Sequence, residues 1–257
     1  MSIFTTEITS DKIPSDNALH HRLLSAYFFA ENYIKGDVIE LGCGEGRGIN
    51  NILKKSRSYT AVDKITEAIN ILSDKYPEQK FFSTSFPPLK NIKSNSFDCV
   101  VSFQVIEHIQ DDDLFISEIY RILRPGGIAL LTTPNIKMTL TRNPWHIREY
   151  TSEELVALAS KHFSNIEIKG VSGNKKVKQY YMDNVKSVEK FKRLDIFNLE
   201  KNLPNFLYKI PYEVLNRFNR DSLKKNDSGL VSSIVSSDYI LLDDKPDNLD
   251  LFLILKK

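Results

Sequence analysis

Long apolar runs are missing from this chain of 257 residues. No stretch of hydrophobic residues approaches the length of about 20 that a membrane-spanning helix requires. The start of the chain, Met1 to Glu7, has neither the basic region nor the apolar region of a secretory signal. We therefore expect a cytoplasmic protein without a membrane span.

Cysteine is scarce, and charge of one sign is not in large excess. The two cysteines are Cys43, in a glycine-rich stretch, and Cys99, inside an apolar run. Neither position suggests a disulfide partner, and both suit a reducing compartment. The net charge of +2 gives no argument for nucleic acid or for an anionic membrane as the partner of the whole chain. With 41% hydrophobic residues, the length allows one large domain, or one domain with an added piece.

Glycine is also infrequent, with 10 residues in the chain, but five of them fall between Gly36 and Gly48. This cluster follows an apolar run, and a buried strand followed by a glycine loop and a helix builds a ligand site at the carboxyl end of the strand. A dinucleotide fingerprint would need glycine where Arg47 stands, and the Gly-Lys-Ser/Thr of a phosphate-binding loop is absent. What is present is an acidic residue and then glycine at alternate positions, namely Glu40, Gly42, Gly44 and Gly46.

That pattern resembles the first motif of class I S-adenosylmethionine (SAM) dependent methyltransferases, of the small-molecule type that includes the ubiquinone and menaquinone biosynthesis enzymes. The resemblance continues in the same order along further segments, Ala61–Lys64, Ser96–Phe103, Gln104–Ile109 and Leu123–Leu131. It covers about half of the chain. It implies S-adenosyl-L-methionine as cofactor and S-adenosyl-L-homocysteine as its product.

Strand-like and helix-like segments alternate through the middle of the chain, which predicts an α/β fold with a doubly wound parallel sheet. The predicted strands are 37–41, 59–63, 80–84, 97–103, 128–133 and 163–168, and the predicted helices are 47–55, 66–75 and 112–123. Thr151 and Glu154 have the spacing of a capping box, so a further helix should begin there. The resemblance adds an antiparallel last strand near 249–255, giving a Rossmann-like sheet of seven strands.

Three parts are expected along the chain. Residues 1–36 should form an N-terminal helical cap, 37–171 with 236–257 the SAM-binding methyltransferase domain, and 172–235 a helical insertion that acts as an acceptor lid. In the cap, His20, His21 and Tyr27 either line the cofactor site or belong to a helix that only packs on the sheet.

Apolar periodicity predicts two helices in the insertion. The first runs from Tyr181 to Phe197, and the second from Leu203 to Phe218 with breaks at Pro204 and Pro211. Between positions 174 and 226 the chain has 13 lysines and arginines against 6 aspartates and glutamates. This local excess either grips an anionic or aromatic acceptor, or forms a solvated face whose aromatic side chains turn inward.

Each part of SAM makes a demand that the motifs could meet. Glycines allow the methionyl end to lie against the backbone, Glu40 could balance its ammonium, and the two oxygens of Asp63 could accept both ribose hydroxyls. For the adenine the family usually has an acid after the third strand, where this chain offers Ser85 and Phe86. The predicted cofactor-binding residues are Glu40, Gly42, Cys43, Gly44, Gly46, Asp63, Lys64, Ser85, Phe86, Phe103 and Gln104.

Two histidines are candidate catalytic residues. A base helps methyl transfer when the acceptor is a hydroxyl, and His108 and His146 are the candidates for it, although Glu107 and His108 could instead only order their segment. With Gln104 they also resemble the Glu-x-x-Glu-His…His metal set of small-RNA 3′-end methyltransferases. The first ligand here is glutamine, which lowers the affinity for a hard cation, so no metal is predicted.

These observations lead to one expected function and two alternatives. We expect a SAM-dependent methyltransferase that modifies an oxygen or nitrogen atom of a small-molecule or saccharide-linked acceptor. The basic insertion alone would support an RNA or protein methyltransferase. A SAM-binding regulatory protein without turnover is the third interpretation.

Overall fold

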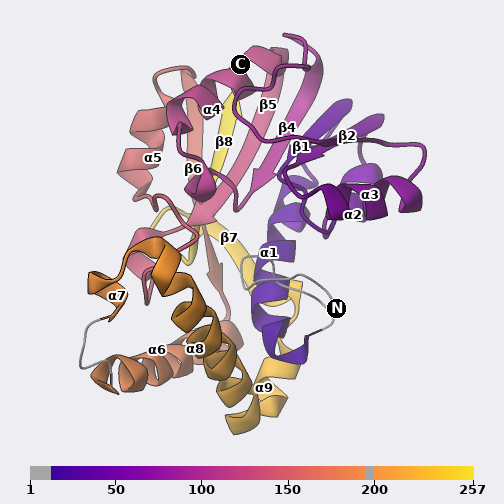
Figure 1. Ribbon diagram of the computed structural model, residues 1–257. Coiled ribbons are helices and arrows are strands. Elements are labelled where there is room, and N and C mark those ends of the chain that lie inside the picture. The colour runs from indigo at the N-terminus through magenta and orange to yellow at the C-terminus, as the bar shows by residue number, and fades with distance from the viewer. Residues whose placement is uncertain (1–12, 195–198) are drawn as a thin grey trace.

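A mixed sheet of eight strands forms the centre of the protein in its computed structural model, which describes residues 13–194 and 199–257 (Figure 1). In their order across the sheet the strands are β3 (Lys80–Ser83), β2 (Ser58–Asp63), β1 (Asp37–Leu41), β4 (Phe97–Phe103), β5 (Leu123–Pro134), β8 (Asp250–Lys256), β6 (Asn165–Gly173) and β7 (Tyr239–Asp243). The first five are parallel, whereas β8 is antiparallel to β5 and β6, and β7 is antiparallel to β6. Chain order reverses between β1 and β4, and such a point leaves a crevice for a ligand at the carboxyl ends of the strands.

Helices cover both faces of this sheet. The helices of the described residues are α1 (Asn17–Ala30), α2 (Ile49–Leu53), α3 (Thr66–Lys75), α4 (Asp112–Ile122), α5 (Ser152–Ala159), α6 (Lys175–Leu194), α7 (Leu199–Asn202), α8 (Asn205–Asn226) and α9 (Ser228–Ser233), and the first five pack on the sheet. Successive strand residues point to opposite faces, so Val38 packs with residues of α1, α2 and α3, and Ile39 with residues of α4 and α5. Both faces are therefore buried, which explains the nearly continuous apolar strands.

The predicted α/β class and the antiparallel last strand are confirmed. The bounds of α3 and β4 match the predicted 66–75 and 97–103. The capping box is also present, because the Thr151 hydroxyl accepts from the Glu154 N–H and the Glu154 carboxylate accepts from the Thr151 N–H. Local signals were sufficient for these elements.

The prediction of seven strands was wrong. The additional strand is β7, which lies at the edge of the sheet beside β6. Its apolar residues Ile240 and Leu242 are exposed. Pairing with β7 and β8 also carries β6 through Gly173, beyond the predicted 163–168. At the other end of the chain, α2 has five residues, because turns occupy the loop before Ile49.

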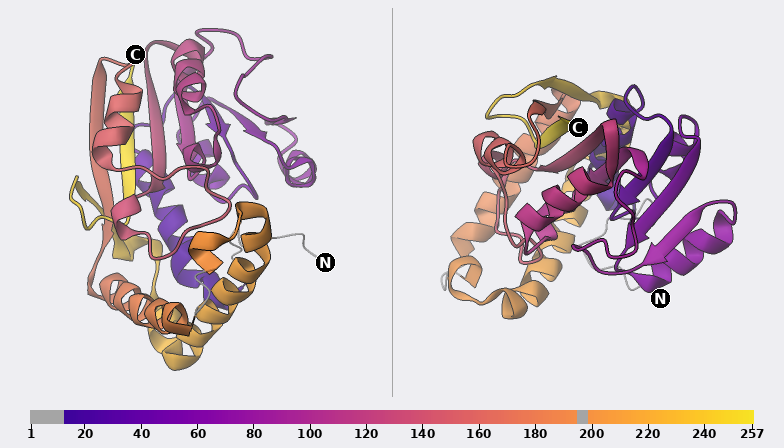
Figure 2. Two further views of the ribbon diagram at one scale, coloured as in Figure 1. Left: turned by 60° about the vertical axis from the view of Figure 1, so that its left-hand side comes forward. Right: turned by 90° about the horizontal axis from the view of Figure 1, so that it is seen from above.

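The predicted insertion is helical in its described residues and lies between β6 and β7. Helices α6 to α9 gather at one end of the molecule, beyond the sheet (Figures 1 and 2). This is the end reached by the carboxyl end of β5, since the Tyr181 hydroxyl donates to the carbonyl of Met138 and the Arg142 guanidinium donates to that of Leu203. The insertion therefore lies at the rim where the crevice opens.

The second predicted helix differs from α8 in two respects. Pro204 precedes the helix as its N-cap residue, and Pro211 lies inside it without breaking it. The apolar residues that give the segment its periodicity, Leu207, Ile210, Val214 and Phe218, form the exposed side of the helix. The first predicted helix corresponds to α6, which ends at Leu194, while Phe197 lies outside the described residues.

The N-terminal cap is tied to the insertion. The carboxylate of Asp16 is fully buried and accepts hydrogen bonds from Arg217 and Arg220 of α8. The Asn17 amide, at the start of α1, donates to carbonyls at Val231 and Ile234. Within residues 13–194 and 199–257, no helix combines the length and apolar character needed to cross a bilayer.

Candidate functional site

The glycine loop after β1 has the backbone that its sequence suggested. Gly42, Gly44 and Gly46 have φ of +82°, +52° and +77°, which residues with a Cβ rarely adopt. The Gly42 N–H donates to the carbonyl of Val62 at 2.7 Å, so the loop is anchored to β2. A Cβ placed on Gly44 would meet no protein atom within 4 Å. The backbone at Gly44 therefore faces open space.

Asp63 holds this loop from the end of β2. Its Oδ2 accepts from the Gly44 N–H at 2.8 Å, and its Oδ1 accepts from the Ile65 N–H at 2.9 Å. Each carboxylate oxygen can accept a second hydrogen bond, so both oxygens can still receive a ligand hydroxyl. The geometry suits a ribose diol above the loop.

A cavity of about 190 Å³ opens over these two residues. It is lined by Gly42, Gly44, Asp63, Lys64, Ile65, Ser85, Phe86, Gln104, Val105, His108 and Ile109. Seven of the predicted cofactor residues are among them, together with the base candidate His108. Ile65, Val105 and Ile109 were missed, although each stands next to a predicted residue in the sequence.

Three other predicted cofactor residues lie behind this lining. Cys43 is buried, and burial raises the pKa of its thiol. A Cβ on Gly46 would collide with Ile49 and Leu72. The ring of Phe103 packs edge-on against the ring of Tyr27, with the two ring centroids 4.9 Å apart. These residues shape the loop and its support rather than the cavity wall.

Glu40, the fourth such residue, is turned into the core. Its two carboxylate oxygens accept hydrogen bonds from the hydroxyls of Tyr27 and Tyr59, and only 1% of the residue is exposed. Burial raises the pKa of Glu40 to about 7. Tyr27 therefore serves packing and the support of Glu40, and His21 bonds to Ser236. None of the cap residues that the structure describes, 13–36, lines the cavity.

Gln104 enters the cavity with a strained backbone. Its φ is +57°, which is uncommon for a residue other than glycine and is found where surrounding structure fixes it. The side-chain amide lies 3.3 Å from both the Thr132 hydroxyl and the Asp250 carboxylate. Arg22 of α1 holds that carboxylate with two hydrogen bonds of 2.7 and 2.6 Å. This hydrogen-bond network holds the side chain of Gln104 in place on the side of β5 and β8.

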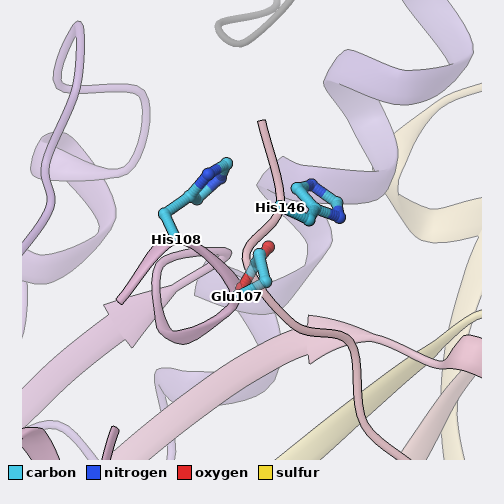
Figure 3. Close-up of side chains that lie close together, drawn as sticks. All are labelled: Glu107, His108 and His146. Carbon is cyan, nitrogen blue, oxygen red and sulfur yellow. The ribbon is translucent and has the colours of Figure 1, made fainter. Parts of the chain in front are cut away.

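The two candidate bases and Glu107 lie close together (Figure 3). Nδ1 of His108 lies 2.9 Å from the carbonyl oxygen of Trp145, and a carbonyl can only accept, so Nδ1 carries the proton. In the neutral ring, Nε2 then has a lone pair. Because His108 also lines the cavity, it is placed to take a proton there.

His146 stands behind His108, with the two rings perpendicular and 5.0 Å apart. Its Nδ1 lies 2.6 Å from a Glu149 oxygen, and its Nε2 lies 2.8 Å from the side-chain nitrogen of Asn143. His146 is not part of the cavity wall. Its hydrogen bonds give it a structural role in the loop after β5.

Glu107 ties that loop to the site. Its carboxylate accepts from the Thr133 hydroxyl at 3.0 Å, its backbone carbonyl accepts from the Ile147 N–H at 2.7 Å, and burial raises its pKa to about 7. Nitrogen and oxygen atoms of Glu107, His108 and His146 lie within 4.8 Å of one another, as metal ligands do. The Gln104 amide, however, is directed to Thr132 and Asp250, so it does not complete the set. The absence of a metal stays a prediction.

Comparison with known proteins agrees with this geometry. Residues 39–131 match the family described as "Methyltransferase domain". This chain contains a methyltransferase domain. It is 38% identical over 128 residues to a "Probable S-adenosylmethionine-dependent methyltransferase" of Mycolicibacterium smegmatis, covering 48% of this chain and 49% of that protein. It is 28% identical over 107 residues to the mitochondrial ubiquinone biosynthesis O-methyltransferase of Rattus norvegicus, covering 38% and 30%.

The chain thus spans half or less of these relatives. Among solved structures, a SAM-dependent methyltransferase from Archaeoglobus fulgidus superimposes with a TM-score of 0.54 over 93% of each chain, at 16% identity. At that identity the likeness supports the Rossmann-like fold alone. The methyltransferase domain is thus related to SAM-dependent enzymes, and the resemblance predicted from the motifs is confirmed.

Proposed function

We propose that this protein transfers the methyl group of SAM to an oxygen or nitrogen atom of a small-molecule or saccharide-linked acceptor. The observation that carries the proposal is the cavity over Gly44 and Asp63, because its wall combines open space above the glycine backbone, a carboxylate that could accept ribose hydroxyls and a histidine whose Nδ1 carries the proton. SAM supplies a sulfonium-bound methyl group that an acceptor lone pair can displace. The protein aligns the two molecules and excludes water.

We assign each part of the cofactor to particular residues of the cavity wall. Gly42 and Gly44 would receive the methionyl end, and Asp63 the ribose hydroxyls. Ser85 and Phe86 would meet the adenine, since both lie on the wall beyond β3. Phe86 stacks on Phe115 with ring centroids 5.8 Å apart, which fixes it for contact with a planar ring. Glu40 would support the glycine loop from beneath, since the hydroxyls of Tyr27 and Tyr59 hold its carboxylate in place.

His108 is proposed as the general base. The Trp145 carbonyl orients its ring with the proton on Nδ1, so Nε2 is the atom that can accept a proton from an acceptor hydroxyl. His146, the other candidate, has Glu149 and Asn143 on its two nitrogens. We therefore assign His146 to holding the loop and not to proton transfer.

The helical insertion is proposed as the lid that selects the acceptor. The loop after β5 joins it to the site, because Trp145 accepts from His108 and also carries the ammonium of Lys209 of α8 over its ring at 3.6 Å. A second cavity lies between the insertion and the loop after β5, lined by Thr141, Val188, Lys192, Glu200, Tyr208, Tyr212, Leu215, Asn216 and Asn219. Oδ1 of Asn219 is buried there and has no hydrogen-bond partner among the described residues. A hydroxyl-bearing part of the acceptor would satisfy it.

The test combines calorimetry with a labelling assay. The purified protein is titrated with S-adenosylhomocysteine and then incubated with methyl-tritiated SAM and a metabolite extract of the source cells. The expected result is binding and label in products that survive protease and nuclease. Label in protease- or nuclease-sensitive material would instead support a protein or RNA methyltransferase. Binding without any labelled product would favour a regulatory protein.

A further inference from the structure

The α-ammonium of SAM needs a hydrogen-bond acceptor, and the residue predicted to balance it is already engaged. Both carboxylate oxygens of Glu40 accept from tyrosine hydroxyls, and Glu40 is not part of the cavity wall. Among the described residues of that wall, Asp63 is the sole carboxylate, and it stands at the end of β2, where the ribose is proposed. A cation that loses water without gaining an acceptor would oppose binding. Another group of the wall must therefore provide one.

The order of the strands indicates where that group lies. Strand β1, which leads into the glycine loop, lies between β2 and β4. Asp63 is the last residue of β2, and Gln104 directly follows β4. The two residues therefore stand on opposite sides of the glycine loop. A cofactor whose ribose lies at Asp63 and whose methionyl end crosses Gly44 would point that end toward Gln104.

The side-chain amide of Gln104 has a defined orientation. Its nitrogen Nε2 lies 3.3 Å from Oδ1 of Asp250, and since a carboxylate accepts, the amide nitrogen is the atom on that side. The same nitrogen lies 3.3 Å from the Thr132 hydroxyl. Within residues 13–194 and 199–257, no hydrogen bond uses the amide oxygen Oε1. Because Gln104 belongs to the cavity wall, this oxygen is an acceptor left for a ligand.

A buried ion pair fixes this orientation. The side chain of Asp250 is 4% exposed, and the guanidinium of Arg22 donates to both of its oxygens, from Nε at 2.7 Å and from Nη2 at 2.6 Å. Because both oxygens accept from the guanidinium, the carboxylate has no proton to donate to Gln104. A hydrogen bond from Nε2 to this charged acceptor also polarises the amide and strengthens Oε1 as an acceptor. A cation gains most from such an oxygen.

We propose that Oε1 of Gln104 receives the α-ammonium of SAM, and that Asp250 and Arg22 are positioning residues that hold the amide for this contact. The inference rests on SAM binding in the cavity as proposed above, and it does not depend on the acceptor or on His108. It assigns to the residue after β4 the task predicted for Glu40. Through Arg22 of α1, it also gives the N-terminal cap a part in cofactor recognition.

Two ligands and one substitution test the contact. Isothermal titration compares S-adenosylhomocysteine with its analogue that has hydrogen in place of the α-amino group. Gln104→Met keeps an unbranched side chain of similar length at the same φ of +57° and removes the amide. Its affinity for S-adenosylhomocysteine should fall roughly 10- to 100-fold, the range for a hydrogen bond to a charged group. The analogue should bind equally to the variant and to the wild type.

A second variant tests the positioning residues. Asp250→Asn keeps the shape of the side chain but lets the Gln104 amide turn, because an asparagine can donate as well as accept. S-adenosylhomocysteine should bind roughly three- to tenfold more weakly. The affinity for the analogue should stay unchanged, which a general loss of structure would not give. Unchanged affinity for both ligands would remove the positioning role.

Gln110→Met is the matched control. Gln110 is exposed and lies outside the cavity wall, so this variant should bind both ligands like the wild type. Circular dichroism verifies that every variant is folded.

Three results would overturn the inference. Gln104→Met could bind S-adenosylhomocysteine as tightly as the wild type, which would assign the ammonium to backbone carbonyls of the glycine loop. It could also weaken the binding of both ligands equally, which would mean that Gln104 shapes the cavity and does not meet the ammonium. Finally, the wild type could fail to bind S-adenosylhomocysteine, and this result alone would also remove the cofactor site proposed above.

Discussion

Replacing Gly44 by valine separates the role of this residue in binding from its role in folding. The site for the new side chain is open, because a Cβ there meets no protein atom within 4 Å. Gly126 provides a matched control. It has a similar φ of +76°, against +52° at Gly44, its Cβ site is also open, and its N–H is likewise hydrogen-bonded. Only Gly44, however, borders the cofactor cavity.

The two substitutions should therefore cost similar stability. A side chain at positive φ costs about 1–2 kcal/mol, and 1 kcal/mol corresponds to about 2–4 °C in a chain of this size. We expect both melting temperatures to fall by roughly 2–8 °C. Binding should differ sharply, because the valine methyl groups at position 44 would occupy the space proposed for the methionyl end. The dissociation constant of S-adenosylhomocysteine from Gly44→Val should rise at least ~100-fold, which corresponds to about 2.8 kcal/mol.

Isothermal titration with S-adenosylhomocysteine measures the binding, and thermal unfolding without ligand measures the strain. Gly126→Val should bind the ligand like the wild type. If the two variants bind equally well, the glycine loop does not cradle the cofactor. A much larger loss of stability at Gly44 than at Gly126 would mean that the open space over the loop is misjudged.

Other predictions concern single groups of the site. Asp63→Ala should weaken S-adenosylhomocysteine binding by about 2–4 kcal/mol with unchanged circular dichroism, because two charge-assisted hydrogen bonds are lost; unchanged affinity would exclude the ribose assignment. Relative to Glu40→Gln, the free energy of unfolding of the wild type should fall as the pH rises from 4.5 to about 7 and then level off, because burial disfavours the charged form of Glu40. Urea unfolding of both proteins at pH 5 and pH 8 measures this difference. A higher relative free energy of unfolding at pH 8 than at pH 5 would contradict the burial effect. His108→Gln should lower the turnover of a hydroxyl acceptor by about 10²–10⁴-fold at unchanged S-adenosylhomocysteine affinity, and normal turnover would remove the base. EDTA should leave turnover unchanged, since both ring nitrogens of His146 already lie at hydrogen-bonding distance from a partner, and activity restored by Mg²⁺ after EDTA would reveal a metal centre.

The cofactor side of the site was predictable because its residues belong to short segments at strand ends. Once the parallel order of β1, β2 and β4 is recognised, Gly44, Asp63 and His108 must meet at one edge of the sheet. The buried setting of Glu40 was not predictable, for a different reason. The hydroxyls that claim its carboxylate come from Tyr27 and Tyr59, and no spacing in the sequence reveals contacts made only in the folded chain.

The insertion shows the same limit on a larger scale. Periodicity located the apolar stripe of α8 correctly but gave no information on which side of the helix faces the protein. The inner side is built instead from Tyr208, Asn219 and Arg220, which are buried through hydrogen bonds and ring contacts. Strand β7 is a different case, because the apolar run from Tyr239 to Leu242 was a readable signal.

Trp145 is the sole tryptophan of the chain, and its position makes it a natural optical reporter. Its carbonyl holds the ring of His108 at the cofactor cavity, while its indole lies under the ammonium of Lys209 on α8. Fluorescence excited at tryptophan's red edge therefore arises from one point between the reaction site and the insertion. Cofactor entry and any displacement of α8 can both be followed by the emission of the unlabelled protein.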